Sequence, residues 1–355
     1  MRGAGQAARF CGRSVGVEAL IPVSHTLIEA NPRRASSEFS ARIHFPGSVL
    51  ARFLELRGRR IVRDCGATWY TGAGRFLMSL PYQALLNPEP SQLRRMIRET
   101  GAFGARFPSA SWSGLESGLY VLRHGDYDLE SLHEKHRPRV SRGLESFYVR
   151  PATKSQVLNQ GWALNLSTMA RQGRYDEEFG DRRRWETFVE AAFACSEISF
   201  PAAFRGSRMA AYMVTCREQR WLHILHQMWR QEDLQNSPNH ALTYTVTQQA
   251  AADPELDAVC YGYAPLCGGT RLHDYKLRFG YEMVPHRAAI QLHPALGLLN
   301  CRLGRAALHV VRGLSQGNQE LQMVETVLEG AHASRPGASF SVPSEPAGRY
   351  TPQKQ

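Results

Sequence analysis

The order of secondary-structure patterns in the second half of the chain restricts its fold more than any other feature. A strand pattern at 146–150 is followed by two amphipathic helix patterns, at 153–171 and 181–196. Three strand patterns come next, separated only by short polar turns, which favours antiparallel pairing. A helix, a strand, a second helix and a last strand complete the series. This order predicts an α+β domain and differs from the regular strand–helix alternation of a dinucleotide-binding domain.

The boundaries of these elements follow from turn and cap residues. We expect strands at 198–204, 208–216 and 221–229, a helix at 238–252, a strand at 256–261, a helix at 270–279 and a last strand at 281–292. Pro238 suits the first turn of its helix, and Gly280 directly follows the end of the next one.

The first half of the chain has a weaker pattern. We interpret residues 1–40 as a loose lead-in because they have little periodicity. A long helix is predicted at 129–142, capped by Asp128 and ended by Gly143, with a break or kink at Pro138.

The length of 355 residues favours two domains over one. We place the first at 41–128 and the second at 129–294, followed by C-terminal helices at 295–332. The segment 333–355 is rich in Ser, Pro and Gly, and it is predicted to be disordered.

The chain is basic, with a formal net charge of +11 and an isoelectric point near 9.5. Such a charge favours an anionic partner, namely the phosphates of a nucleotide cofactor, a tRNA or a membrane headgroup. The alternative is that an arginine-rich proteome makes basic proteins without special partners.

Cysteine usage and hydropathy indicate the compartment. The seven cysteines are scattered and contain no CxxC pair, which favours reduced thiols over disulfides or a zinc site. No apolar stretch is long enough to cross a membrane, and the N-terminus lacks the apolar core of a secretory signal. We therefore expect a cytoplasmic protein, with peripheral membrane contact left open.

Four sequence blocks carry a family resemblance. They are FRGSRMAAYMV at 204–214, SPNHALTYTVTQQA at 237–250, LHDYKLRFGYEMVPHR at 272–287 and the basic segment HEKHRPRVSRGLESFYVRP at 133–151. Together with the element order, they resemble the GNAT acyltransferase superfamily, and more narrowly its Fem-type and CelD/BioF-like branch. The resemblance covers 145–294 well and 60–142 as a degenerate first copy.

The resemblance implies an α+β fold of two GNAT-like domains, each a mixed, mostly antiparallel sheet flanked by helices, the second better formed. It implies an N-acyltransferase with acyl-CoA (acetyl-CoA or longer) as co-substrate and no metal. The acceptor would be an amine on a small molecule or on a lipid- or sugar-linked precursor, bound between the domains.

One departure affects the donor. Family members that bind acetyl-CoA commonly carry a glycine-bearing turn before the central helix, whereas 230–238 has no glycine and two acidic residues. Close approach of backbone to pyrophosphate favours glycine and free N–H groups. Aminoacyl-tRNA, a donor of the Fem branch, is therefore the second candidate. A third hypothesis is a non-catalytic module that kept the fold.

The residues expected to act on the acyl group lie near the end of the second domain. Lys276 would neutralise a phosphate or a developing oxyanion, the alternative being a solvated surface lysine. Tyr275 and Tyr261 would protonate the leaving group, although core packing is the commoner role of tyrosine. His226 would be the general base, or a core histidine with satisfied hydrogen bonds. His223 would face the other side of the strand, so the two cannot share a metal.

The donor is expected where strand 221–229 splays from its parallel neighbour 256–261, because backbone N–H groups there can hold and polarise a carbonyl. The residues assigned to donor binding are Gln227, Met228, Trp229, Arg230, Ser237 and Asn239. Asn239 would present the helix N-terminus to phosphate, with Ser237 or Asn236 as the alternative helix cap. Substrate binding is assigned to Arg139, Arg142 and Tyr212, with a solvated helix face and core packing as the alternatives.

Overall fold

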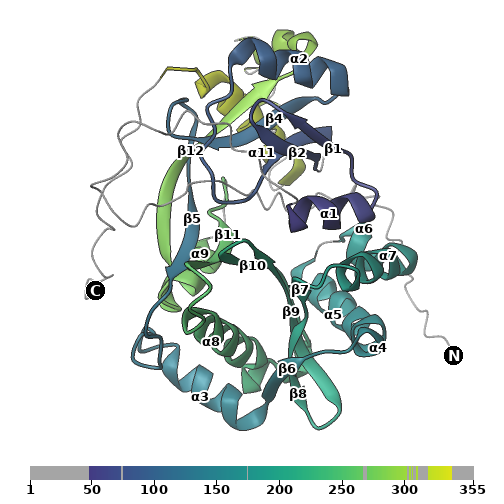
Figure 1. Cartoon of the computed structure of the whole chain (residues 1–355), viewed down its shortest axis with the longest axis vertical. Coiled ribbons are helices and arrows are strands. Elements are labelled where there is room, and N and C mark those ends of the chain that lie inside the picture. Colours follow the sequence, from purple (N-terminus) through teal and green to yellow (C-terminus); the bar gives the residue numbers. More distant parts are fainter. Residues whose placement is uncertain are drawn as a thin grey trace, which may run out of the picture.

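The computed structural model describes residues 48–72, 75–173, 175–266, 270–301, 304, 306, 309–310 and 319–337 (Figure 1). The predicted lead-in at 1–40 lies outside this range, as does the predicted disordered tail from 338 onward. Residues 333–337 of that tail are ordered instead, since Pro336 forms a bridge with Trp112 and the amide of Arg335 donates to Ser113 Oγ over 2.9 Å.

The strands form one large sheet in the order β1-β2-β3-β4-β12-β5-β11-β10-β9-β8-β6, with β7 paired to β9 at the side. Their bounds are β1 Ile61–Asp64, β2 Ala67–Thr71, β3 Phe76–Leu80, β4 Gly104–Ser109, β5 Leu115–Arg123, β6 Tyr148–Pro151, β7 Ile198–Ser199, β8 Pro201–Arg205, β9 Arg208–Glu218, β10 Trp221–Trp229, β11 Ala258–Tyr263 and β12 Glu282–Leu292. Among the strands of the described residues, only β3/β4 and β10/β11 are parallel pairs. The predicted class, a mostly antiparallel sheet flanked by helices, is confirmed.

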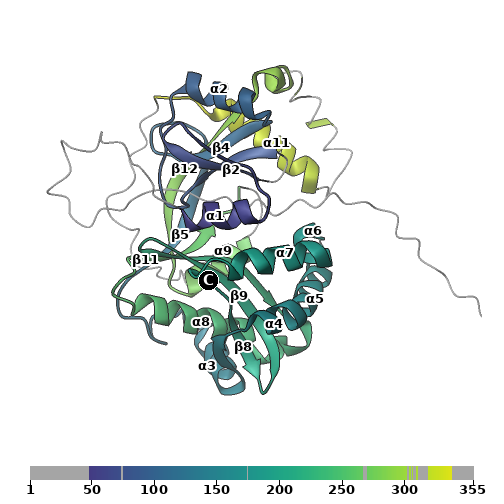
Figure 2. The same cartoon turned by 45° about the vertical axis from the view of Figure 1, so that its right-hand side comes forward.

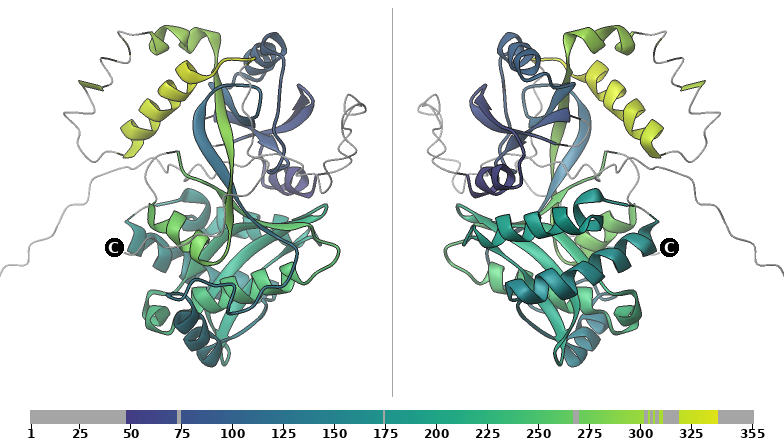
Figure 3. Two further views of the ribbon diagram at one scale, coloured as in Figure 1. Left: turned by 90° about the vertical axis from the view of Figure 1, so that its left-hand side faces the viewer. Right: turned by 90° about the vertical axis from the view of Figure 1, so that its right-hand side faces the viewer.

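The helices cover both faces of this sheet. Their bounds are α1 Val49–Leu56, α2 Pro90–Thr100, α3 Arg137–Ser146, α4 Lys154–Gln156, α5 Trp162–Gln172, α6 Glu177–Gly180, α7 Arg182–Phe193, α8 Pro238–Ala251, α9 Thr270–Arg278 and α11 Gln319–Ala333. Figure 1 shows α5 and α7 on one side of β9 and β10, and α8 with α3 on the other. In the two views of Figure 3, the long strands β5 and β12 run from the upper part of the molecule into the lower part.

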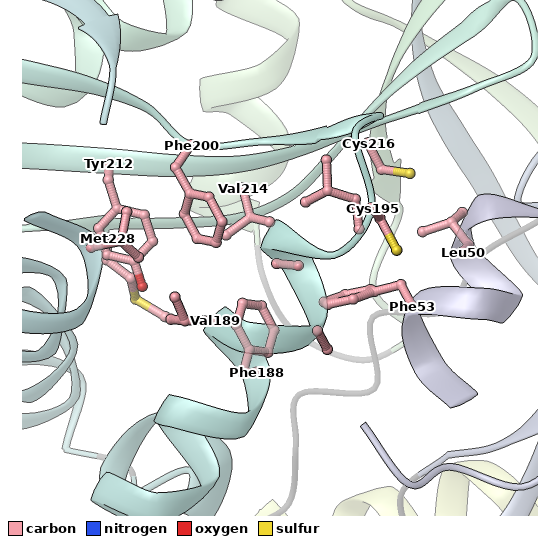
Figure 4. Packing of buried hydrophobic residues seen from close by; sticks show 14 of the residues in the cluster. Leu50, Phe53, Phe188, Val189, Cys195, Phe200, Tyr212, Val214, Cys216 and Met228 are labelled. Atoms are coloured by element: carbon pink, nitrogen blue, oxygen red, sulfur yellow. The ribbon is translucent and has the colours of Figure 1, made fainter. Parts of the chain in front are cut away.

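The first helix packs into a core that residues of both halves of the chain share. Leu50 and Phe53 of α1 lie with Phe188 and Val189 of α7 in one buried cluster (Figure 4). The rings of Phe53 and Phe188 meet edge to face with centroids 5.3 Å apart. Figure 2 shows α1 above α7, between the two parts of the sheet. This shared core holds the two halves together.

The predicted helix at 129–142 is wrong in its start and its end. The helix α3 begins at Arg137, because Asp128 caps a local turn instead, accepting from the Ser131 amide over 2.9 Å. Pro138 therefore lies in the first turn, where its missing N–H costs no hydrogen bond, and it produces no kink. Gly143 lies inside the helix instead of ending it.

C-terminal helices were predicted at 295–332. In the structure, Pro294–Asn300 forms a 3-10 helix and α11 follows at Gln319–Ala333. Of the helices that the structure describes, none combines the length and the apolar character that a bilayer span requires.

Candidate active site

The parallel strands β10 and β11 pair only at their beginnings. Trp221, Leu222 and His223 are matched with Ala258–Cys260, after which the register of β10 against β9 shifts between Ile224 and His226. Beyond these residues the two strands no longer pair with each other. We call this part, Ile224–Trp229 of β10 and Tyr261–Tyr263 of β11, the splayed end. The predicted separation of these strands is thus confirmed. Helix α8 follows β10 after the segment Gln231–Asn236, and α9 is the next helix after β11, so their side chains meet beside the splayed end.

A hydrogen-bond network crosses the splayed end. The hydroxyl of Tyr261 on β11 donates to Gln227 Oε1 on β10. Gln227 Nε2 donates in turn to the carbonyl of Asn239 over 3.2 Å and to Thr243 Oγ1 over 3.0 Å, both on α8. The hydroxyl of Tyr275 on α9 lies 3.0 Å from Thr243 Oγ1. Four elements therefore converge on one polar cluster, which contains four of the residues predicted from sequence.

Lys276 is buried beside this network, with 5% of its surface exposed. Its Nζ lies 4.3 Å from the ring centroid of Tyr120 and 5.0 Å from that of Tyr261. Among the residues that the structure describes, it has neither an ion pair nor a hydrogen bond. Burial lowers the pKa of its amine to about 7, so charged and neutral forms coexist near neutrality. The alternative of a solvated surface lysine is thereby excluded.

The tyrosines around Lys276 remain protonated at neutral pH. Burial raises the pKa of Tyr261 and of Tyr275 above the ordinary value for a phenol. Burial also raises the pKa of Tyr120, to about 12, and its hydroxyl lies 2.7 Å from Nδ1 of His273. These hydroxyls can therefore donate a proton or a hydrogen bond to a bound group.

The N-terminus of α8 is less open than the sequence predicted. Ser237 is in the left-handed region, with φ 56° and ψ 46°, and its side chain makes no capping hydrogen bond, so the predicted Ser237 cap is wrong. The amide of Ser237 donates to the carbonyl of Leu234 over 3.0 Å, and Pro238 has no N–H. A Cβ at Gly143 of α3 would lie 2.7 Å from the Ser237 carbonyl oxygen, so α3 lies directly against this turn.

We expect Gly143→Val to destabilise the fold by about 1–3 kcal/mol, because the added side chain must push α3 away from α8. The new Cβ would also lie 2.9 Å from that of Ala241. Urea unfolding measures this change. Gly297→Val is the control, since a Cβ there meets nothing within 4 Å. Equal unfolding midpoints for the two variants would contradict the close packing.

Backbone groups at the end of β10 are already bonded to α5. Thr168 Oγ1 accepts from the amide of Trp229 over 3.1 Å and donates to its carbonyl over 3.0 Å. Ser167 Oγ accepts from the amide of Gln231 over 3.0 Å. The segment that follows, Gln231–Asn236, is a 3-10 helix with Glu232 and Asp233 in its first turn. These groups are thus less available to a phosphate than the sequence pattern implied.

Three predicted residues lie away from the Lys276 network. The imidazole of His226 packs on the α7 side, its centroid 4.7 Å from Phe179 and 5.8 Å from Phe188. Met228 is buried in the same core. Tyr212 is fully buried and donates its hydroxyl to Asn165 Oδ1. Tyr212 was assigned to substrate binding and His226 was assigned as the general base. Both side chains instead pack against core residues.

The predicted arginines lie near the start of α8. Arg142 Nη1 donates to the carbonyl of Gln235 over 3.2 Å. Burial, together with the charge of Arg139, lowers the pKa of His240 to about 4. Arg230 Nη2 lies 3.5 Å from the carbonyl of Met209. Arg139 and Arg142 therefore bring positive charge to the start of α8.

A second polar group lies on the face of β10 opposite Gln227, which is also the face of His226. The prediction that His223 and His226 face opposite sides of the strand is therefore wrong, because the irregularity between Ile224 and His226 shifts the alternation. His223 is 1% exposed, and neither ring nitrogen has a hydrogen-bond partner among the described residues. Its ring meets that of Tyr82, which follows β3, with centroids 5.1 Å apart. Burial lowers the pKa of His223 to about 3, so it is neutral. The hydroxyl of Tyr263, at the end of β11, is also buried without a partner in the described part of the chain.

Sequence reasoning missed several residues of the site. Thr243 reads as an ordinary helix residue, and Tyr120 lies in an apolar strand pattern. Only the chain topology brings them beside Lys276. Tyr82 reaches His223 from the first half of the chain in the same way, and no local signal marks it.

One group of potential metal ligands occurs elsewhere in the described residues. His309, Glu325 and Glu329 have ligand atoms within 4.8 Å of one another. Nδ1 of His309 lies 2.9 Å from Oε1 of Glu325.

Comparisons with known proteins agree with this architecture. No family model matches the sequence, and no curated protein matches it. The crystal structure of FemX superposes with a TM-score of 0.50 at 10% identity, over 71% of this chain and 93% of FemX. A domain of a putative lysylphosphatidylglycerol synthetase from Agrobacterium fabrum gives 0.48 at 13% identity, over 72% and 91%. A GCN5-related N-acetyltransferase from Kribbella flavida gives 0.40 at 10% identity, over 67% and 92%.

At such low identity, the likeness to FemX concerns the fold alone. This chain therefore shares the fold of FemX, and membership of the GNAT superfamily stays a prediction. The narrower placement in a Fem-type or CelD/BioF-like branch stays a prediction.

Proposed function

We propose that the chain is an acyltransferase whose reaction takes place at the splayed end of β10 and β11. The observation that carries this proposal is the buried Lys276, an amine with no counterion among the described residues and with two tyrosine rings around it. Burying a cation without a partner is unfavourable, so such a group is retained where it acts on charge that develops during a reaction.

The chemistry follows from the groups in the network. The acceptor nitrogen adds to the donor carbonyl, and the carbonyl oxygen becomes an oxyanion. The Lys276 ammonium stabilises this oxyanion. As the bond between the carbonyl carbon and the leaving group breaks, the leaving group takes a proton from the hydroxyl of Tyr275 or Tyr261, and the tyrosinate takes up the proton that the acceptor nitrogen loses. We propose no general base, since His226 lies on the α7 side of the sheet.

The donor has two candidates. Acyl-CoA is the one that the family resemblance implies. Aminoacyl-tRNA is favoured by the surroundings of α8, because α3 lies against Ser237 and the segment Gln231–Asn236 has no glycine and two acids. A phosphate would gain few free N–H groups there. An RNA donor would instead use the basic surface of a chain with a net charge of +11.

The acceptor would approach from the opposite face, where His223 and Tyr263 offer unpartnered polar atoms. Buried polar groups of this kind normally bond to protein, water or a ligand. This face lies at the junction of the two halves, since Tyr82 belongs to the first half. A small-molecule amine and a lipid- or sugar-linked amine are both compatible with this arrangement.

A transfer assay with both labelled donors tests the proposal. Acetyl-CoA and a mixture of aminoacyl-tRNAs are each incubated with a panel of amines, and label in the amide product is measured for the wild type and for Lys276→Met. We expect one donor class to give product, and the variant to lose it. A tRNA donor should also bind with a steep salt dependence, whereas acyl-CoA should raise the melting temperature at constant salt. No product with either donor would favour the non-catalytic module.

A further inference from the structure

The guanidinium of Arg171 packs against Trp229, at the end of β10. Arg171 lies in the last turn of α5, and its central carbon stands 4.2 Å from the ring centroid of Trp229. Its terminal nitrogens Nη1 and Nη2 are buried, and neither has a hydrogen-bond partner among the described residues. Nε1 of Trp229 is also buried and without a partner in the described part of the chain.

The position of Arg171 follows from the link between α5 and β10. Thr168 holds the backbone of Trp229 at both its amide and its carbonyl. Arg171 is three residues further along α5 and lies on the same helix face as Thr168. Trp229 is two residues beyond Gln227 on β10, so both side chains lie on one face of the strand. Arg171 thus lies at the end of the wall that carries the Lys276 network.

The unpaired state of this guanidinium has a chemical meaning. A buried cation usually forms an ion pair, and arginine forks typically bind a carboxylate or phosphate through two parallel hydrogen bonds. Stacking on Trp229 orients the guanidinium plane, but Nη1 and Nη2 at its edge form no hydrogen bond with the described residues. Arg150 is different: it stacks on Phe204 at 4.0 Å, but its Nη1 bonds to Pro151 O and Gln156 Oε1.

We propose that Arg171, oriented by Trp229, binds an oxyanion, either a carboxylate or a phosphoryl group, of the molecule that enters the splayed end. That this molecule is a substrate rests on the proposed function, but the binding itself does not. The ligand displaces the protein atoms that bury Nη1 and Nη2. It supplies the two hydrogen-bond acceptors that these nitrogens lack among the described residues. The substrate class is thereby narrowed to molecules with an anionic group close to the reacting acyl or amine.

The test measures binding without turnover. Sodium acetate or inorganic phosphate replaces chloride at constant ionic strength, while tryptophan fluorescence and melting temperature are recorded. We expect a saturable response in the wild type, and the anion that saturates at the lower concentration identifies the class. Arg171→Gln should show no response and, without oxyanion, should melt no lower than the wild type. Trp229→Phe should keep the thermal response and lose the fluorescence change.

Three variants keep the result decisive. Arg150→Gln is the matched control and should respond like the wild type. Lys276→Met should also respond, which separates anion binding from the transfer reaction. If Arg171→Gln does not fold, Arg171→Lys keeps the charge without the fork and should bind about tenfold more weakly. The proposal is overturned if the wild type does not respond, or if both Arg171 variants respond as the wild type does.

Discussion

Replacing Lys276 by methionine should abolish most of the transfer activity and, at the same time, make the protein more stable. Removal of one group that stabilises an oxyanion typically lowers kcat by about 10²–10³-fold. The gain in stability arises because the wild type holds an ammonium that is 5% exposed and lacks an ion pair in the described residues. Methionine fills a similar volume without a charge.

The gain in stability should depend on pH. The pKa of Lys276 falls from 10.5 in the unfolded chain to about 7 in the folded protein. Between these values the unfolded state binds more protons, so the stability of the wild type rises with pH. Below pH 7 both states are protonated, and the full cost of burial applies. The variant should therefore exceed the wild type most below pH 7, and the difference should shrink toward pH 10.

Melting curves from pH 6 to pH 10 measure this effect, together with the transfer rate at each pH. Lys154→Met is the control, because Lys154 is exposed and pairs with Glu190 on the surface. It should change neither activity nor the pH dependence of stability. A lower melting temperature for Lys276→Met at every pH would mean that the amine has a structural partner, contrary to the proposal.

Arg57→Ala should cause the largest loss of stability among the variants considered, about 3–5 kcal/mol, because it leaves Glu178 buried without its partner. The two side chains are 8% and 14% exposed, and Arg57 Nε donates to Glu178 Oε1 over 2.9 Å. The guanidinium also lies 4.9 Å from the ring of Phe53 and 4.8 Å from that of Phe188. Burial acts to raise the pKa of Glu178, but the charge and hydrogen bond of Arg57 hold it below its usual value.

This pair connects α1 to α6 and so joins the two halves of the chain. Urea unfolding of Arg57→Ala should be compared with Arg95→Ala, whose exposed ion pairs contribute at most about 1 kcal/mol. The double variant Arg57→Met with Glu178→Leu should recover most of the loss, because neither charge remains. Similar midpoints for Arg57→Ala and Arg95→Ala would show that the buried pair does not hold the halves together.

The sequence predicted the second half of the fold well because its signals are local. Strands β9 and β10 alternate or repeat apolar residues between short turns, and their antiparallel register follows. The prediction of a helix at 129–142 was wrong because Asp128 and Gly143 are ambiguous signals. Asp128 caps a turn as readily as a helix, and Gly143 serves the close approach to α8. Strand β4 was not predicted, and its partner β12 is distant in sequence. Strand β2 was missed although it pairs with its sequence neighbours β1 and β3.

The sequence motifs predicted part of the candidate site. The block around Lys276 pointed to the correct helix, and Gln227, Asn239, Tyr261 and Tyr275 converge on it. The sequence could not show that Lys276 is buried, since burial depends on Tyr120 and Tyr261 from two other strands. Arg171 carries no sequence signal either. We infer its role from the absence of hydrogen-bond partners among the described residues, and a sequence does not show hydrogen bonds.

The most direct test of the central claim is the reactivity of the Lys276 amine toward a trace acylating reagent, followed by mass spectrometry across pH 5 to 11. We predict that labelling rises through about pH 7 and is suppressed by the donor that supports transfer. Lys154 provides the reference within the same sample. Labelling of Lys276 that rises only near pH 10.5, and that the donor leaves unchanged, would contradict the assignment of the active site.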